Sequence, residues 1–157
     1  MTGPDLLIAD EAVSSLDVSV QAQILQLIRS LQQEHGIAFL FISHDLAVIR
    51  QIADEVAVMY RGQVLEHAPA DVFFCGPAHP YSTELLALAN YQTPTSHQSH
   101  PWRLGRGREA HDQTFTCVYA DVCAKKMQVC EDKEPAYHII QDMNGKHCVR
   151  CHLYDEA

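Results

Sequence analysis

A short apolar run near the start of the chain ends in two adjacent acids. The run from Leu6 to Ala9 is followed directly by Asp10 and Glu11, as in a buried parallel strand that delivers carboxylates to the edge of a sheet. Open α/β sheets bind ligands at this end of their strands. Asp10 offers the oxygen ligands that Mg²⁺ takes, and Glu11 can orient a water molecule against a γ-phosphate. A strand that simply ends in solvated acids would give the same pattern.

The residues after these acids predict a βαβ unit. A helix is expected after Asp17, with Asp17 or Ser19 as its cap and Gly36 marking its end. Residues 37–42 are apolar, aromatic or β-branched, as in a second strand buried on both faces. Strand, helix and strand in this order make a unit of parallel strands. The apolar stripe expected on the helix is Ile24, Leu27, Ile28 and Leu31.

His44 follows the second predicted strand. If the strands are parallel, it lies at the same sheet edge as Asp10 and Glu11. The alternative is a loop histidine beside a helix that starts near Asp45. Further predicted elements are a helix over residues 46–53, a strand over 56–60, a hairpin turn at 61–63 and a short helix over 70–74.

Three segments in this order resemble motifs of the ABC-transporter ATPases. Residues 6–11 resemble the Walker B strand, and Ser-Ser-Leu-Asp at 14–17 resembles the D-loop. Phe-Ile-Ser-His-Asp at 41–45 resembles the segment of the switch histidine. Ala12 departs from the family, which usually has proline there; this loosens the turn without removing a chemical group.

The resemblance implies a fold and a set of roles. The fold class is α/β: the C-terminal part of a P-loop ABC ATPase domain, with parallel strands and flanking helices, plus a small irregular Cys-rich tail. Asp10 would bind Mg²⁺ and the nucleotide, and Glu11 would polarise the attacking water. His44 would sense the γ-phosphate as the second catalytic residue. Asp17 would meet the partner subunit across the bound ATP.

His-Pro-Tyr-Ser-Thr-Glu-Leu-Leu at residues 79–86 resembles a signature of the oligopeptide and dipeptide branch of this family. The resemblance implies an ATP-hydrolysing subunit of a peptide importer. Its partners would be a second ATPase subunit and transmembrane permease subunits, at the cytoplasmic face of the inner membrane. The expected boundaries are 1–90 for the ATPase part, 91–112 for a linker and 113–157 for the Cys-rich extension.

Two motifs of the resembled family have no counterpart in this sequence. It contains neither a G-x-x-x-x-G-K-[ST] phosphate loop nor a Leu-Ser-Gly-Gly-Gln signature. The resemblance therefore covers the C-terminal half of the family's subunit, and the chain has the pattern of a fragment or a truncated product. Without backbone amides and a lysine around the phosphates, the chain alone is not expected to bind or hydrolyse ATP effectively.

Composition argues against two classes of protein. The 157 residues carry a formal net charge of −9, whereas broad nucleic-acid binding needs clustered Lys and Arg. No apolar run reaches the length of a membrane span, and no secretory leader is readable. Six cysteines in such a chain indicate thiols or a metal centre rather than a disulfide framework.

All cysteines except Cys75 lie in the last part of the chain. A short segment with few large apolar residues cannot build its own core, and a metal centre supplies the missing cross-links. The segment is similar to the cysteine-bearing extension of peptide importer ATPases, which in some members holds a [4Fe–4S] cluster. Zinc, and free or disulfide-bonded thiols, are the alternatives; with zinc, Cys148 would compete for the fourth position. The similarity assigns the cluster to Cys117, Cys123, Cys130 and Cys151.

Two functions from different classes follow. The first is an energy-coupling ATPase subunit of a peptide importer, with ATP and Mg²⁺ as cofactors. The second is a non-catalytic metal-binding or regulatory module in which the tail is the active feature. ATP turnover restored by adding an N-terminal half would distinguish the first from the second.

Overall fold

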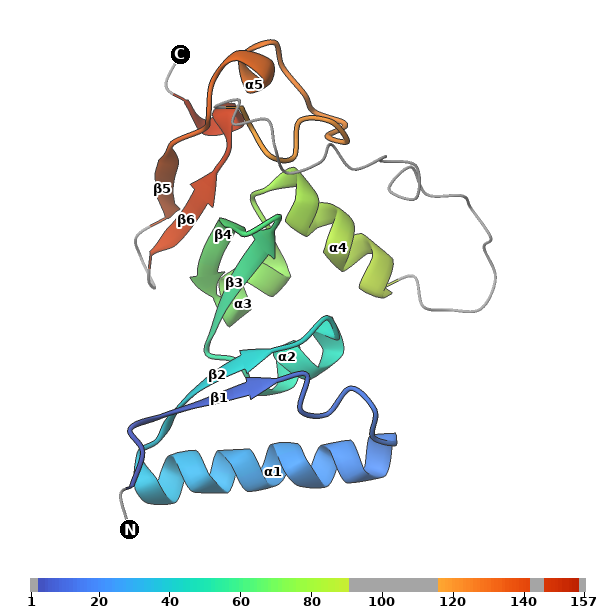
Figure 1. Ribbon diagram of the computed structural model, residues 1–157, viewed down its shortest axis with the longest axis vertical. Helices are drawn as coiled ribbons and strands as arrows, with labels where there is room; N and C mark the ends of the chain where they lie inside the picture. Colours follow the sequence, from blue (N-terminus) through green and yellow to red (C-terminus); the bar gives the residue numbers. More distant parts are fainter. Residues whose placement is uncertain (1–2, 91–115, 142–145, 156–157) are drawn as a thin grey trace. The chain divides into compact units, whose positions relative to one another are not determined.

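The computed structural model describes residues 3–90, 116–141 and 146–155. The chain divides into two compact units, Met1–Ala53 and Asp54–Ala157 (Figure 1). The predicted linker, residues 91–112, lies outside the described residues. No helix in the described part of the chain is both long and apolar enough to span a membrane.

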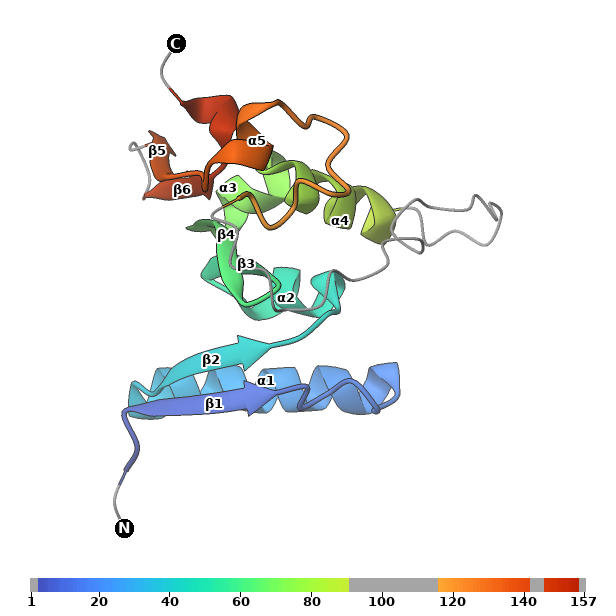
Figure 2. The ribbon, with the colours of Figure 1, turned by 45° about the horizontal axis from the view of Figure 1, so that its top comes forward.

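The first unit is the predicted βαβ arrangement followed by a helix. It consists of β1 (Leu6–Asp10), α1 (Val18–His35), β2 (Ala38–Ile42) and α2 (Leu46–Ile52). β1 and β2 are parallel, with Cα pairs running from Leu6 opposite Ala38 to Asp10 opposite Ile42. Figures 1 and 2 show α1 running alongside this pair of strands. The carboxyl ends of both strands therefore meet at one edge.

Side-chain and glycine caps set the ends of the helices. Asp17 caps α1, since its Oδ1 accepts the N–H groups of Ser19 and Val20, each at 3.0 Å. Gly36 ends α1 in the left-handed conformation with a φ of 65°, which costs glycine little. Asp45 caps α2 in the same way as Asp17 caps α1. The sequence predicted both ends of α1 correctly.

Two expectations about burial are wrong. Leu27 is exposed, and Leu25 takes its place beside Ile28 on the buried side of α1. The strands were expected to be buried on both faces, but exposed and half-buried residues alternate along β1 and β2. This alternation is the pattern of a sheet covered on one face. The small core beneath the covered face is built on Val13, Leu25 and Val48, with Ile24, Phe41 and Ile52 packed against it.

The uncovered face of the β1–β2 sheet predicts self-association of the isolated chain. Leu6, Ile8, Leu40 and Ile42 are 44% to 65% exposed, and a contiguous apolar face of this kind favours association. Replacing both Ile8 and Leu40 with Thr places a β-branched residue, which suits a strand, at each position and removes apolar area. Light scattering should therefore show less association of the double variant. Leu27→Thr on α1 is the matched control and should change little. A wild-type chain that sediments as a monomer at high concentration would contradict this expectation.

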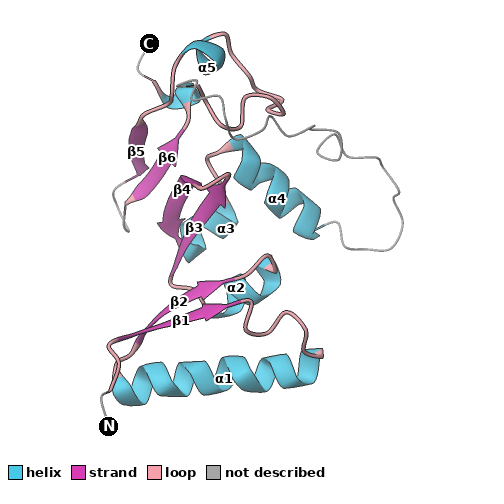
Figure 3. Ribbon diagram, in the orientation of Figure 1, coloured by secondary structure: helices cyan, strands magenta, loops and turns pink. Residues whose placement is uncertain are grey.

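The second unit is built on an antiparallel sheet. Its elements are β3 (Glu55–Tyr60), β4 (Gln63–Pro69), α3 (Ala70–Cys75), α4 (Pro80–Asn90), α5 (Val129–Asp132), β5 (Tyr137–Gln141), β6 (His147–Arg150) and a 3₁₀ turn (His152–Tyr154). The strand order is β3-β4-β6-β5, drawn in magenta in Figure 3. The predicted hairpin turn between β3 and β4 is present, with φ of 46° at Arg61 and 80° at Gly62. Positive φ at both central residues matches the right-handed twist of a hairpin.

The Cys-rich segment contributes to this sheet, although its residues 116–128 form turns and bends. Its strand β6 pairs antiparallel with β4, Glu66 opposite Val149 and His67 opposite Cys148. The fold class is therefore mixed α/β, with one parallel and one antiparallel sheet in the described residues. The expected parallel strands are present in the first unit. The expectation of a wholly irregular tail needs correction, because strands β5 and β6 of the tail extend a sheet begun by the β3–β4 hairpin.

Candidate functional site

The turn after β1 is held by backbone contacts. Glu11 has a φ of 49°, a left-handed conformation that costs a non-glycine residue about 1–2 kcal/mol. Its N–H donates to the carbonyl of Ile42 at 2.9 Å, and its carbonyl accepts from the N–H and Oγ of Ser14 at 3.2 and 3.0 Å. The turn is thus fixed although it contains Ala12 rather than proline. Backbone strain of this kind is concentrated at functional sites.

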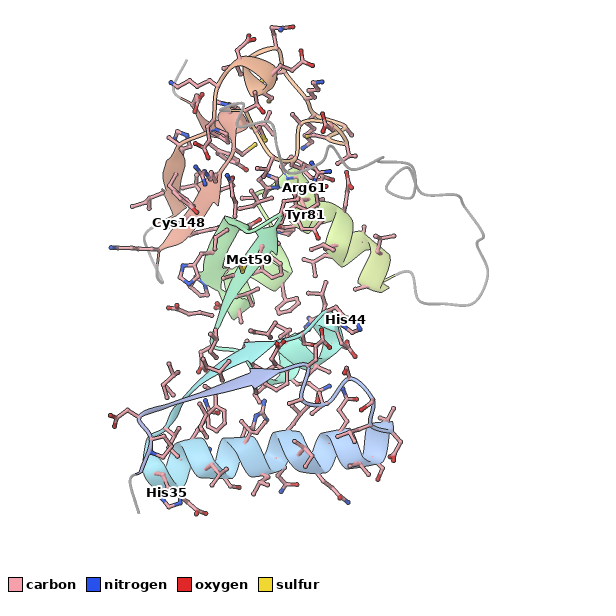
Figure 4. The ribbon with its side chains drawn as sticks, viewed as in Figure 1. His35, His44, Met59, Arg61, Tyr81 and Cys148 are labelled. Atoms are coloured by element: carbon pink, nitrogen blue, oxygen red, sulfur yellow. The ribbon has the colours of Figure 1, made fainter. Side chains whose placement is uncertain are left out.

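Glu11 and His44 meet at the carboxyl ends of the parallel strands. Nδ1 of His44 lies 2.9 Å from Oε1 of Glu11, although 33 positions separate the two residues. An ionised carboxylate can only accept, so Nδ1 is the donor. The hydrogen bond with Glu11, together with Coulomb attraction to the same carboxylate, raises the pKa of His44 above its ordinary value. Both side chains are exposed, and Figure 4 shows His44 beside the start of α2.

The two other predicted acids have different surroundings. Asp10 is the last residue of β1 and is exposed, next to Glu11 in the chain and paired through its Cα with Ile42. Asp17 accepts the first N–H groups of α1, as described above. Helix capping therefore explains Asp17 within the fold. Its contact with a partner subunit, and the binding of Mg²⁺ by Asp10, stay predictions.

Replacing Glu11 with Gln should lower the pKa of His44 toward its ordinary value. The substitution removes the carboxylate that stabilises the protonated imidazole, and this carboxylate is the largest cause of the raised pKa. Because the pKa is raised, the Glu11–His44 ion pair is present at low pH and is lost as the pH rises through that pKa. NMR titration of the imidazole measures the change, with His67 beside Glu55 as the internal control. An unaltered His44 titration would mean that the pair does not form in solution.

Backbone N–H groups act on the sulfurs of four of the six cysteines. The N–H of Met127 lies 3.5 Å from Sγ of Cys130. Burial raises the pKa of Cys117, Cys123 and Cys151, for Cys151 to about 11. Backbone N–H groups oppose this effect because they stabilise the thiolate. Their donors are Tyr119 and Ala120 for Cys117, Lys125 for Cys123 and Leu153 for Cys151.

The same four thiols act on one another electrostatically. Cys130 and Cys117 raise the pKa of Cys123, and all three of these thiols raise the pKa of Cys151. In the described part of the chain, neither Cys75 nor Cys148 is among the groups that shift these pKa values. Cys148 lies on β6, where Figure 4 labels it. The thiols that act on one another in this way are the four that the sequence similarity selects, and their assignment to one metal centre stays a prediction.

Metal binding finds no geometric support in the placed side chains. Within residues 3–90, 116–141 and 146–155, no group of three or more His, Cys, Asp or Glu side chains is arranged so that it could hold a metal ion. The zinc and iron–sulfur expectations therefore stay predictions.

A buried polar cluster in the second unit was missed by sequence reasoning. Glu66 on β4 and His147 on β6 are both buried and lie 2.8 Å apart, from Oε1 to Nε2. His79 is also buried, and burial lowers its pKa to about 4; its Nδ1 accepts the N–H of Tyr81 at 3.0 Å. The only signal in the sequence was the His-Pro-Tyr segment itself, which was assigned to a family signature without a physical role.

Comparison with known proteins adds a sequence relationship. No protein-family model matches the chain. A putative peptide import ATP-binding protein of Brucella abortus is 39% identical over 153 residues, covering 96% of this chain and 43% of the relative. A probable peptide ABC transporter ATP-binding protein of Sinorhizobium fredii is 42% identical over 150 residues, covering 96% of this chain and 42% of the relative.

The dipeptide transport ATP-binding protein DppF of Escherichia coli is 38% identical over 156 residues, covering 99% of this chain and 46% of the relative. The chain thus spans less than half the length of each of these relatives. The matched part of the relatives is their C-terminal half. By sequence, the chain is a homologue of the C-terminal half of peptide and dipeptide ABC transporter ATP-binding proteins.

Proposed function

We propose that this chain supplies the water-activating side of the ATP site in the energy-coupling subunit of a peptide importer. The observation that carries the proposal is the Glu11–His44 hydrogen bond of 2.9 Å at the shared edge of β1 and β2. A carboxylate held by a histidine at this edge is suited to orient a water molecule for in-line attack on a phosphoryl group. The names of the relatives concern peptide import and dipeptide transport, and they support the assignment to a peptide importer.

The residues present fit one side of a Mg-ATP site. Asp10, exposed at the end of β1, is a hard oxygen ligand suited to Mg²⁺. Glu11 would accept a hydrogen bond from the attacking water. His44 holds the Glu11 carboxylate through Nδ1, and its Nε2 would be the atom to meet the γ-phosphate. When bound, ATP would supply the phosphoryl group, and Mg²⁺ would neutralise part of the negative charge on its phosphates. The phosphate cradle has to come from a loop that this sequence does not contain.

The resemblance to the ABC-transporter ATPases extends the proposal to partners and location. We assign Asp17, beyond its role as a helix cap, to the face that meets a second ATPase subunit across the nucleotide. Transmembrane permease subunits would carry the peptide, and the complex would place this chain at the cytoplasmic face of the membrane. The homology to peptide and dipeptide import proteins supports these assignments.

The chain alone should bind Mg-ATP weakly. Most charge-assisted contacts to the phosphates are missing, and the remaining ones support a Kd of about 1 mM or weaker. Isothermal titration calorimetry of the 157-residue chain measures this directly. Binding in the micromolar range would mean that the chain forms a phosphate site from other residues.

Complementation tests the proposed function. The chain is combined with the N-terminal half of a relative such as DppF, and ATP turnover is measured for each part and for the mixture. We expect turnover only in the mixture. An assembled, ATP-binding mixture without turnover would contradict the proposal and favour a non-catalytic module.

A second proposal is that the four-cysteine cluster, Cys117, Cys123, Cys130 and Cys151, binds a [4Fe–4S] cluster. The observations that favour it are the hydrogen bond from the N–H of Met127 to Sγ of Cys130 at 3.5 Å and the backbone N–H groups that lower the pKa of Cys117, Cys123 and Cys151 against the effect of burial. Such bonds stabilise thiolates and tune iron–sulfur centres. The four cysteine thiolates would be the residues that hold such a cluster. When bound, the cluster would supply a cross-link for this segment and a one-electron redox centre.

A further inference from the structure

A fully buried carboxylate joins three segments of the second unit. Oε1 of Glu66 accepts the N–H of Ala78 at 2.7 Å and lies 2.8 Å from Nε2 of His147. Oε2 of Glu66 accepts the N–H of His79 at 2.8 Å. Glu66 and His147 are almost completely shielded from solvent. A buried carboxylate is tolerated only while its hydrogen-bond donors stay in place.

These donors come from two places that the sequence separates widely. Ala78 and His79 form the turn that leads into α4, while His147 begins β6, 81 positions after Glu66. Glu66 therefore fixes the start of β6 against the turn before α4. We call this set of contacts among Glu66, Ala78, His79 and His147 the Glu66 latch.

The segment held by the latch carries Cys151. β6 ends at Arg150, one residue before Cys151. Three residues after Cys151, the hydroxyl of Tyr154 donates to the carbonyl of Ala78 at 3.0 Å. Contacts on both sides of Cys151 therefore reach the same turn before α4, and they leave Cys151 only 8% exposed.

The other cysteines are anchored to α4 by a different contact. The hydroxyl of Tyr119 donates to Oε2 of Glu84 on α4 at 2.7 Å. The N–H of Cys117 donates to the carbonyl of Cys130 at 3.0 Å, which joins the two ends of this segment. The four cysteines thus lie on two pieces that share α4 and its preceding turn as an anchor. The pieces also touch directly, since Nε of Arg150 donates to the carbonyl of Pro135 at 3.0 Å and Nε2 of His152 lies 2.8 Å from the carbonyl of Lys133.

We propose that Glu66 is the positioning residue that brings Cys151 to the other three cysteines, through the latch to the turn before α4. This gives the His-Pro-Tyr segment a physical role, because the backbone of Ala78 and His79 binds the carboxylate that places β6. The latch does not depend on a bound metal. Only its expected effect on iron content rests on the proposed iron–sulfur function.

Thiol alkylation tests the latch in the full chain without metal. Iodoacetamide labelling is stopped at intervals, and mass spectrometry reads the labelling rate at each cysteine. In the wild type, Cys151 should react slowly, because it is buried, and the exposed Cys75 should react fast. Glu66→Gln cannot accept from all three donors, so the labelling rate at Cys151 should rise about tenfold or more. Cys117 and Cys130, held through Tyr119, should keep their protection.

Matched variants separate the latch from general unfolding. Glu55→Gln removes the carboxylate of an exposed glutamate–histidine pair, Glu55 with His67, and should leave every labelling rate unchanged. His147→Gln keeps an N–H donor and should retain the protection of Cys151, whereas His147→Phe should lose it. Unchanged protection of Cys151 in both Glu66→Gln and His147→Phe would overturn the proposal. Equal exposure of all four cysteines in His147→Phe would overturn it too.

Iron analysis after anaerobic reconstitution extends the test. If the wild type binds iron and sulfide, Glu66→Gln should retain several-fold less of both than Glu55→Gln, by loss of the Cys151 ligand. Iron retained equally by both variants would contradict the positioning role. A wild type without iron refutes the iron–sulfur proposal alone, because the alkylation experiment still decides whether the latch exists.

Discussion

Glu11→Gln, in a subunit completed by an N-terminal half, should lower ATP turnover about a hundredfold or more while ATP binding is retained. The amide keeps the size of the side chain and part of its hydrogen bonding. It removes the negative charge proposed to polarise the attacking water, which also attracts Nδ1 of His44 at 2.9 Å. Steady-state turnover and nucleotide binding, measured on the same preparation, separate loss of chemistry from loss of affinity.

Two companion variants make this experiment specific. Asp10→Asn should weaken Mg²⁺-dependent nucleotide binding as well as turnover, because it removes the proposed metal ligand rather than the group proposed to activate water. Glu34→Gln, a glutamate on α1 away from the sheet edge, should behave as the wild type. If Glu11→Gln hydrolyses ATP normally while Asp10→Asn does not, the two roles have been assigned wrongly.

The first unit could be predicted from sequence because its signals are local. Asp17 and Gly36 lie at the two ends of one helix and act on neighbouring N–H and C=O groups. The parallel pairing of β1 and β2 follows from the order of strand, helix and strand. That pairing also brings Glu11 to His44, so the sequence alone could predict that these two residues lie close together.

Tertiary packing determines which face of α1 is buried, and local sequence signals do not. Apolar residues stand at both position 25 and position 27, and a helical stripe can be drawn through either. Val13 and Val48 pack with Leu25, which leaves Leu27 exposed. The exposed face of β1 and β2 could not be predicted, since an apolar run indicates burial without saying what covers it.

The second unit depends on contacts between distant parts of the chain. The β3–β4 hairpin was predicted from its turn, but the pairing of β4 with β6 joins residues about eighty positions apart. Glu66 is buried beside Leu65, so two consecutive residues of β4 are shielded. A register shift at Val58 and Met59 accompanies this break in the alternation. From the sequence, a glutamate between Leu65 and His67 is expected to be exposed to solvent. This expectation explains why the Glu66 latch was not predicted.

Cys151→Ser should abolish cluster binding, whereas Cys148→Ser should leave it intact. The two thiols are three positions apart, yet only Cys151 belongs to the group of mutually interacting thiols with Cys117, Cys123 and Cys130. Serine oxygen is a poor substitute for a thiolate that binds iron. The measurement is iron, acid-labile sulfide and zinc per chain after anaerobic purification, with the visible absorbance of the cluster as a second readout.

Three results of this experiment have different meanings. Iron with equal sulfide, lost in Cys151→Ser but kept in Cys148→Ser, supports a [4Fe–4S] cluster on the four-cysteine cluster. One zinc per chain without sulfide contradicts the iron–sulfur proposal, and zinc retained in Cys151→Ser but lost in Cys148→Ser would transfer the fourth position to Cys148. Neither metal in the wild type, with freely titratable thiols, would refute metal binding. The buried thiol of Cys151, with its pKa raised by burial to about 11, would then be part of the packing between β6 and the turn before α4, where the Glu66 latch and the Tyr154–Ala78 hydrogen bond hold the residues on its two sides.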